Sequence, residues 1–102
     1  MRTQLVFKAL ADPSRREILR LLQRQSMTAG QLAEAFDMTK GTLSHHFKIL
    51  KQAELVRSEK RAQQRVYSIN TTVVEDVAAM LFELFGAPGG RLPAAVARRR
   101  QT

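Results

Sequence analysis

The chain of 102 residues is 44% hydrophobic, which suffices for one small domain and leaves little room for a second. Seventeen Lys and Arg against nine Asp and Glu give a formal net charge of +8, which favours a polyanionic partner such as nucleic acid or an anionic membrane surface. With no cysteine, the chain carries neither disulfides nor thiolate chemistry. It shows neither the apolar segment of a secretion signal nor an apolar run of about 18 residues, so we expect a cytoplasmic protein without membrane insertion.

The first quarter of the chain predicts two helices. Between Thr3 and Ala11 apolar residues recur at helical spacing, which predicts a short first helix. Asp12 followed by Pro13 marks a second start, because aspartate caps free amides and proline fits the first helical position. This helix is expected to end near Gln25. Its apolar stripe is Ile18, Leu19, Leu21 and Leu22, and its arginines fall largely off that stripe, at Arg15, Arg16, Arg20 and Arg24.

Residues 28–50, TAGQLAEAFDMTKGTLSHHFKIL, hold two helical patterns separated by a tight break. Thr28 and Gln31 have the spacing of a capping box and open a third helix. Asp37 and Met38 form the turn, and Thr39 caps a fourth helix. This is the layout of a helix-turn-helix that reads DNA. The buried positions expected on the third helix are Leu32, Ala33 and Phe36.

The fourth helix divides into a packing face and a free face. Steps of three and four residues place Leu43, His46, Phe47 and Leu50 on the packing face, and Gly41, Ser44, His45 and Lys48 on the free face, called here the reading face. Small and hydroxylated side chains allow close approach to base edges, so Thr42, Ser44 and His45 are expected to read bases rather than serve as ordinary solvated residues. Lys40 and Lys48 are expected to meet phosphates. The DNA-binding residues predicted on this helix are Thr39, Lys40, Gly41, Thr42, Ser44, His45 and Lys48.

Two strands are predicted after the fourth helix, at 55–59 and 65–69, joined by a polar hairpin tip at 60–64. From Lys40 to Arg65 there are seven basic residues and two acidic ones. This local excess favours contact of the hairpin, a two-stranded β-wing, with the minor groove or the DNA backbone over a merely solubilising turn. The DNA-binding residues predicted in the wing are Lys60, Arg61, Gln63, Gln64 and Arg65.

A fifth helix is predicted from Thr71 to Phe85, with Asn70 as its cap. It is apolar on more than one side, and a chain of this size has only one core to offer it. The second apolar face is therefore expected to meet a second copy of the chain. Residues 1–85 are expected to form one DNA-binding and dimerisation domain, and residues 86–102, with GAPGG and three terminal arginines, a flexible basic tail.

The order of elements is that of a mainly α winged helix-turn-helix, and here a family resemblance becomes specific. The stretches VFKALADPSRREILRLL, TAGQLAEAF and SHHFKILKQAELV resemble the ArsR-type repressors of bacteria, most closely the metal-independent autorepressors of the sporulation-delay type. The resemblance runs from about Leu5 to Phe85. It implies a homodimeric repressor that binds double-stranded DNA at an inverted-repeat operator, with the first and last helices forming the dimer interface. The interface residues expected on these helices are Leu5, Val6, Val77, Met80, Leu81 and Leu84.

Two further classes of function remain as alternatives. ArsR-type metal sensors take thiolates from the third helix or His and carboxylates from the last, whereas here the third helix has no Cys and the last has no His. Scattered carboxylates on the last helix are usually its solvated face, so we predict no metal site and no cofactor. His45 and His46 point about 100° apart and cannot chelate one ion together, which makes His46 a packing residue with a satisfied nitrogen.

A winged domain can also serve as a protein-interaction module. The basic reading face with its small residues argues against that alternative. Enzyme activity is not expected, because the sequence shows no cysteine nucleophile, no Gly-rich phosphate loop and no Ser-His-acid arrangement. Without a sensor site, derepression would come from a protein partner, from a small-molecule inducer or through simple autoregulation.

Overall fold

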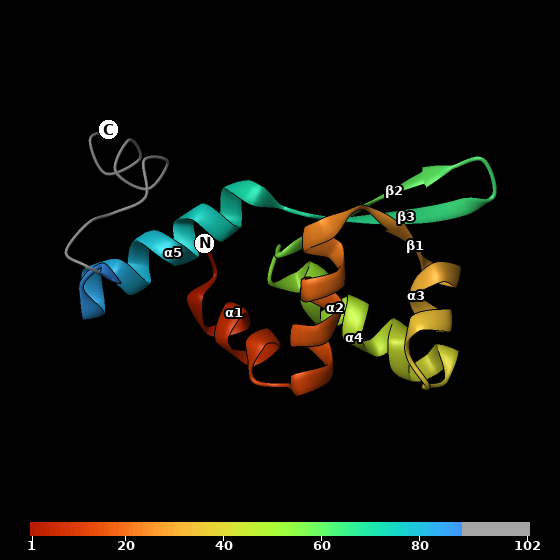
Figure 1. Ribbon diagram of the computed structural model, residues 1–102, viewed down its shortest axis with the longest axis horizontal. Coiled ribbons are helices and arrows are strands. Elements are labelled where there is room, and N and C mark those ends of the chain that lie inside the picture. Colours follow the sequence, from red (N-terminus) through yellow and green to blue (C-terminus); the bar gives the residue numbers. More distant parts are fainter. Residues whose placement is uncertain (89–102) are drawn as a thin grey trace.

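The computed structural model describes residues 1–88, and the predicted basic tail lies outside the described residues from position 89 onward. The described elements are α1 (Thr3–Leu10), α2 (Pro13–Arg24), β1 (Met27–Thr28), α3 (Ala29–Ala35), α4 (Lys40–Gln52), β2 (Val56–Arg61), β3 (Gln64–Ile69) and α5 (Thr71–Phe85). The predicted winged helix-turn-helix is confirmed, with one added strand. In Figure 1 the β2–β3 hairpin extends to one end of the molecule and α5 to the other.

Side-chain caps begin three of the helices where the sequence predicts them. The Asp12 carboxylate accepts hydrogen bonds from the backbone N–H groups of Ser14, at 2.7 Å, and Arg15, at 3.1 Å. Thr28 and Gln31 form the full capping box of α3, with distances of 3.1 and 2.9 Å. The Thr39 hydroxyl accepts from the N–H of Thr42 at 3.1 Å and starts α4. These bonds satisfy amides that a helix start otherwise leaves free.

The sheet has three antiparallel strands in the order β1-β3-β2. The sequence does not predict strand β1, because two residues are too few to show a period; its pairing comes from Tyr67 and Val66 of β3. The hairpin arms are also longer than predicted, since β2 runs on to Arg61 and β3 starts at Gln64. Backbone pairing extends the strands through polar residues that propensity alone assigns to the tip.

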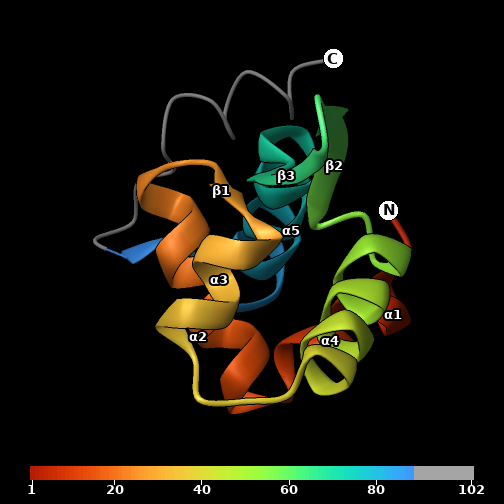
Figure 2. The same ribbon diagram turned by 90° about the vertical axis from the view of Figure 1, so that its right-hand side faces the viewer.

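The core lies between α1, α2, α3, α4, the sheet and the first half of α5. Its largest fully buried side chains are Ile18, Leu32, Leu50 and Val6. Ala33 and Phe36, expected to be buried, are only partly buried and pack against this core. Figure 2 shows α1 and α4 side by side, with α2 and α3 beside them and the sheet above. Helix α4 is thus held on its packing face.

One buried arginine ties three helices together. Arg15 of α2 is expected off the apolar stripe, but its side chain is buried. Its Nε donates to the carbonyl of Ala9 at 2.8 Å and its Nη2 to that of Lys8 at 2.9 Å, at the C-terminal end of α1. Its Nη1 lies 3.2 Å from Nδ1 of His46 on α4. The prediction that His46 is a packing residue with a satisfied nitrogen is confirmed, and the partner is Arg15.

The C-terminal end of α4 leads into the wing without a linker. The N–H of Glu54 donates to the carbonyl of Lys51 at 2.9 Å, and the N–H of Leu55 donates to that of Leu50 at 3.1 Å. This is the Schellman pattern, in which the residue after the cap adopts a left-handed backbone. Glu54 does so, with φ of 59°. Buried Leu55 then precedes β2 directly.

Helix α5 has the predicted bounds and the predicted N-cap residue, but the capping hydrogen bond is missing. Asn70 makes no side-chain capping bond, and its Oδ1 is buried without a hydrogen-bond partner within residues 1–88. Val73 and Val77 anchor the first half of the helix in the core. Its last turn is open to solvent, since Leu84 is 65% exposed and Phe85 82%.

Candidate nucleic-acid interface

Helix α4 separates its two faces as the periodicity predicts. The packing face, Leu43, His46, Phe47 and Leu50, is 7% exposed or less at every position. On the other side Gly41, Thr42, Ser44, His45 and Lys48 are all exposed. The polar and basic groups on this side are therefore available to a ligand, while the hydrophobic side chains fix the helix on the body of the protein.

The first turn of α4 is organised by two threonines. Thr39, the cap, also donates from its hydroxyl to that of Thr42 at 2.9 Å. This bond leaves the Thr42 hydroxyl free to donate its own proton outward. Gly41 has no side chain, and the atom nearest to where a Cβ would stand is the Thr39 hydroxyl oxygen, 4.0 Å away, so the surface beside the cap is open. The first turn can thus approach a flat partner such as a base edge.

The predicted wing residues are all exposed, but they are not all at the tip. Lys60 pairs with Arg65 and Arg61 with Gln64 across the two strands, and only Gln63 lies in the turn, with Ala62. Arg61 forms an ion pair with Glu59, and Arg65 donates to the Ser58 hydroxyl at 3.2 Å. The guanidinium of Arg61 therefore has a partner already, which reduces the free positive charge of the wing.

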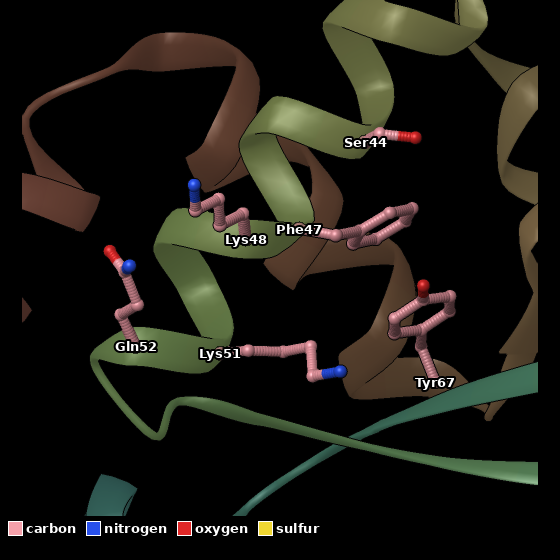
Figure 3. A pocket seen from close by; sticks show the side chains of 6 residues that line it. All are labelled: Ser44, Phe47, Lys48, Lys51, Gln52 and Tyr67. Atoms are coloured by element: carbon pink, nitrogen blue, oxygen red, sulfur yellow. The ribbon is translucent and has the colours of Figure 1, made fainter.

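A hollow lies between α4 and the wing. Its volume is about 420 Å³, and we call it the α4–wing hollow; it is lined by Ser44, Phe47, Lys48, Lys51, Gln52 and Tyr67. The rings of Phe47 and Tyr67 are stacked, with centroids 4.0 Å apart and planes 8° apart. Figure 3 shows Ser44, Phe47 and Lys51 pointing from α4 toward the Tyr67 side, while Lys48 and Gln52 extend along the other edge.

Sequence reasoning missed three lining residues of this hollow. Lys51 and Gln52 continue the reading face by one further turn, so steps of three and four from Ser44 and Lys48 could have included them. Tyr67 could not be found in this way, because its position depends on the pairing of β3 with two other strands. Burial raises the pKa of the Tyr67 phenol, against the opposing influence of Arg65, so this hydroxyl remains a neutral hydrogen-bond donor.

The six expected interface residues have different surroundings. Val6 is 0% exposed and Val77 8%, so both side chains belong to the core of the protomer and are not presented to a partner. The physical reason is that α1 and the first half of α5 already use these apolar positions to pack against their own domain. Leu5, Met80 and Leu81 are partly buried, and Leu84 is largely open. Exposed Phe7, Val74 and Phe85 add further apolar area on α1 and α5.

Within residues 1–88, no three His, Asp or Glu side chains are gathered in a way that could hold a metal ion. The rings of His45 and His46 lie 6.2 Å apart and are tilted by 50°, and His46 is engaged by Arg15. None of the helices in this part of the chain combines the length and apolarity needed to cross a membrane.

Comparison with known proteins identifies the family of this chain. Residues 12–58 match the family model described as bacterial regulatory protein, arsR family. The chain is 52% identical over 71 residues to the transcriptional repressor SdpR of Bacillus subtilis (strain 168), a match that covers 70% of this chain and 79% of SdpR. The chain belongs to the ArsR family.

Further relatives of this ArsR-family protein support the same family assignment. An arsenical resistance operon repressor of Staphylococcus xylosus is 43% identical over 65 residues, which are 64% of this chain and 62% of that repressor. The solved structure of an ArsR-like transcriptional regulator from Rhodococcus sp. RHA1 has a TM-score of 0.74 at 26% identity, over 96% of this chain and 82% of that one. The ArsR-family protein is therefore a DNA-binding transcriptional regulator and not an enzyme.

Proposed function

We propose that this ArsR-family protein is a homodimeric repressor, and an autorepressor, that binds an inverted-repeat operator and blocks promoter access without a metal-sensing site. The observation that carries the proposal is the division of α4, whose Ser44, His45 and Lys48 are exposed while its opposite face is locked in the core. A fixed helix with free polar side chains can hold a defined register in a major groove.

The base-reading residues in this proposal are Thr42, Ser44 and His45, with Gly41 allowing close approach. Lys40 and Lys48 flank them and would contact phosphates, together with the five wing residues Lys60, Arg61, Gln63, Gln64 and Arg65. Residues 1–85 would act as one DNA-binding and dimerisation domain. Acting on promoters, the protein would work in the cytoplasm, associated with the nucleoid when bound.

Dimerisation is supported by the apolar side chains that the protomer leaves open on α1 and α5. Phe7 is 45% exposed, Val74 42% and Leu84 65%. Apolar area of this kind is usually covered by another surface. A symmetric dimer would place two α4 helices about 34 Å apart, in successive major grooves of one face of the duplex. Such a complex would exclude polymerase from the promoter.

Metal independence is supported by the chemistry of the available donors. The sequence has no cysteine, and the described residues offer no cluster of three other ligands. A metal-responsive repressor would need such a set. Derepression would then come from a protein partner, from a small-molecule inducer or through simple autoregulation.

The proposal is tested by selecting bound sites from random DNA and measuring affinity for the selected operator and for random DNA. Because both side chains are proposed to contact bases, Ser44→Ala and His45→Ala are each expected to cost about 1–3 kcal/mol on the operator and much less on random DNA. Ser26→Ala, an exposed serine outside α4, is the matched control. Equal losses on both DNAs would contradict base reading, and the absence of a preferred sequence would overturn the repressor proposal.

A further inference from the structure

We infer that the α4–wing hollow is the binding site of one DNA backbone phosphate per protomer, held by Lys51 and Tyr67 in addition to the reading face. The inference rests on the proposed function and extends it to residues that neither the helix-turn-helix pattern nor the wing charges include. The hollow joins the two DNA-contacting elements, since Ser44 and Lys48 line it from α4 and Tyr67 lines it from β3.

The lining has the chemistry of an anion site. The residues that line the hollow carry two ammonium groups, two hydroxyls and one amide, and none of them carries a carboxylate. Phe47 and Tyr67 are only 4% and 8% exposed, so their stacked rings form a firm floor. Lys48, Lys51 and Gln52 are exposed and can adapt at the rim. A phosphodiester carries one negative charge and accepts several hydrogen bonds, which matches these donors.

The position of Lys51 favours a backbone phosphate over a base. Lys51 follows Ser44 by seven residues, which is about 10 Å along a helix axis. The major groove is about 12 Å wide. When Ser44 near the start of α4 contacts bases, Lys51 would therefore lie near the groove edge, where the sugar-phosphate strand of DNA runs. Figure 3 shows Lys51 directed toward this space.

The openness of the site favours a polymer over a free small anion. The hollow is bordered by exposed lysines, and a single mobile anion would bind them weakly in water. A DNA phosphate is instead held near the site by the protein–DNA contacts on either side of it. The floor of the site is also tied to the core, because Phe47 belongs to the packing face of α4.

Lys51→Ala and Tyr67→Phe test the inference, with Lys8→Ala as the matched control for removal of one exposed lysine. Tyr67→Phe keeps the ring and removes only the hydroxyl. Affinity is measured from about 50 to 200 mM salt on the selected operator and on random DNA. Loss of one phosphate contact in each protomer means that the dimer neutralises two phosphates fewer. The slope of log affinity against log salt is then smaller in magnitude by about 1.8. Raising the salt over this range therefore lowers the affinity of the variant about tenfold less than that of wild type.

We expect Lys51→Ala to show this smaller slope on both DNAs, with the ratio of operator to random affinity unchanged, and Lys8→Ala to keep the wild-type slope. Tyr67→Phe is expected to weaken both complexes by the same factor. Replacing single operator phosphates with neutral methylphosphonates locates the contact: one position per half-site should impair wild type but not Lys51→Ala.

Thermal unfolding confirms that each variant is folded. Identical slopes and identical methylphosphonate patterns for wild type and Lys51→Ala would overturn the inference while leaving the repressor proposal standing. Wild-type protein that binds no DNA would overturn both.

Discussion

Asp12 stabilises the start of α2 through its ionised carboxylate. Its pKa lies below the ordinary value: partial burial acts to raise it, but the hydrogen bonds from the N–H groups of Arg15 and Ser14, with the charge of Arg15 beside it, outweigh that effect. A lowered folded-state pKa means that the carboxylate stabilises the fold at neutral pH. This contribution is lost as the pH falls below about 4, toward the folded-state pKa.

Asp12→Asn keeps a capping oxygen but removes the titrating group, so its stability is expected to fall less than that of wild type on acidification. Urea unfolding at about pH 6 and about pH 3 measures the two free energies of unfolding for each protein. Other carboxylates titrate in both proteins, and the difference between the two pH dependences isolates Asp12. Equal losses in both would exclude Asp12 as a source of acid sensitivity.

Single residues also show how far sequence reasoning extends. Asp12, Thr28 and Thr39 are caps as their spacing predicts, because capping depends on neighbours two or three residues away. The pattern places Arg15 off the apolar stripe, because the partners that bury it belong to α1 and to a helix 31 residues later. Because arginine is polar, the burial of its guanidinium by three such bonds does not appear in the hydrophobic periodicity of the sequence. Asn70 occupies the predicted N-cap position of α5, but its side chain makes no capping hydrogen bond, and its Oδ1 is buried instead.

Among the elements, the end of α4 carries a measurable strain. Glu54 holds φ of 59°, a left-handed conformation that costs a non-glycine residue about 1–2 kcal/mol. Glu54→Gly removes this cost but also gives the unfolded chain more freedom. We expect a net gain of about 0.5–1 kcal/mol in the free energy of unfolding, measured in urea. Glu54→Ala is the control, because it removes the charge and retains the strain; an equal gain in that variant would assign the effect to charge.

The wing is the second element with a specific expectation. Arg61→Ala should weaken binding to operator and random DNA alike and reduce the salt slope by about one for each phosphate that it no longer neutralises. Because Glu59 forms an ion pair with Arg61, Glu59→Gln is expected to do the opposite and strengthen binding to both DNAs. Titrations at several salt concentrations measure both variants. An unchanged slope for Arg61→Ala would show that this residue does not touch the DNA.

The elements themselves are largely predictable because each has a local signal. The period of three and four residues in α4 identifies both of its faces, and the two sides have the expected exposures. Strand β1 and the α4–wing hollow are not predictable. Both depend on β3, whose Tyr67 pairs with Met27 through the backbone and stacks on Phe47 through its ring. Contacts between segments 20 to 40 residues apart leave no pattern in either segment alone.

At the scale of the whole molecule, the open last turn of α5 makes dimerisation testable without unfolding. Leu84 is 65% exposed in the protomer, so Leu84→Glu removes little from the core. We expect the variant to remain folded and to sediment as a monomer, because a buried charge would destabilise a shared apolar interface. Thr72→Glu, an exposed position in the first turn of the same helix, is the matched control. A dimeric Leu84→Glu protein, or a monomeric wild type, would refute the interface on α5.

The direct passage from α4 through Glu54 and Leu55 into β2 has a consequence for the DNA. The reading helix and the wing have no hinge between them, and the stack of Phe47 on Tyr67 joins them again further along. We therefore expect their separation to change little on binding, so that the duplex would take up any mismatch with the spacing of the grooves. Base steps that bend easily, such as TA and CA, are then expected at positions of the operator that no side chain touches.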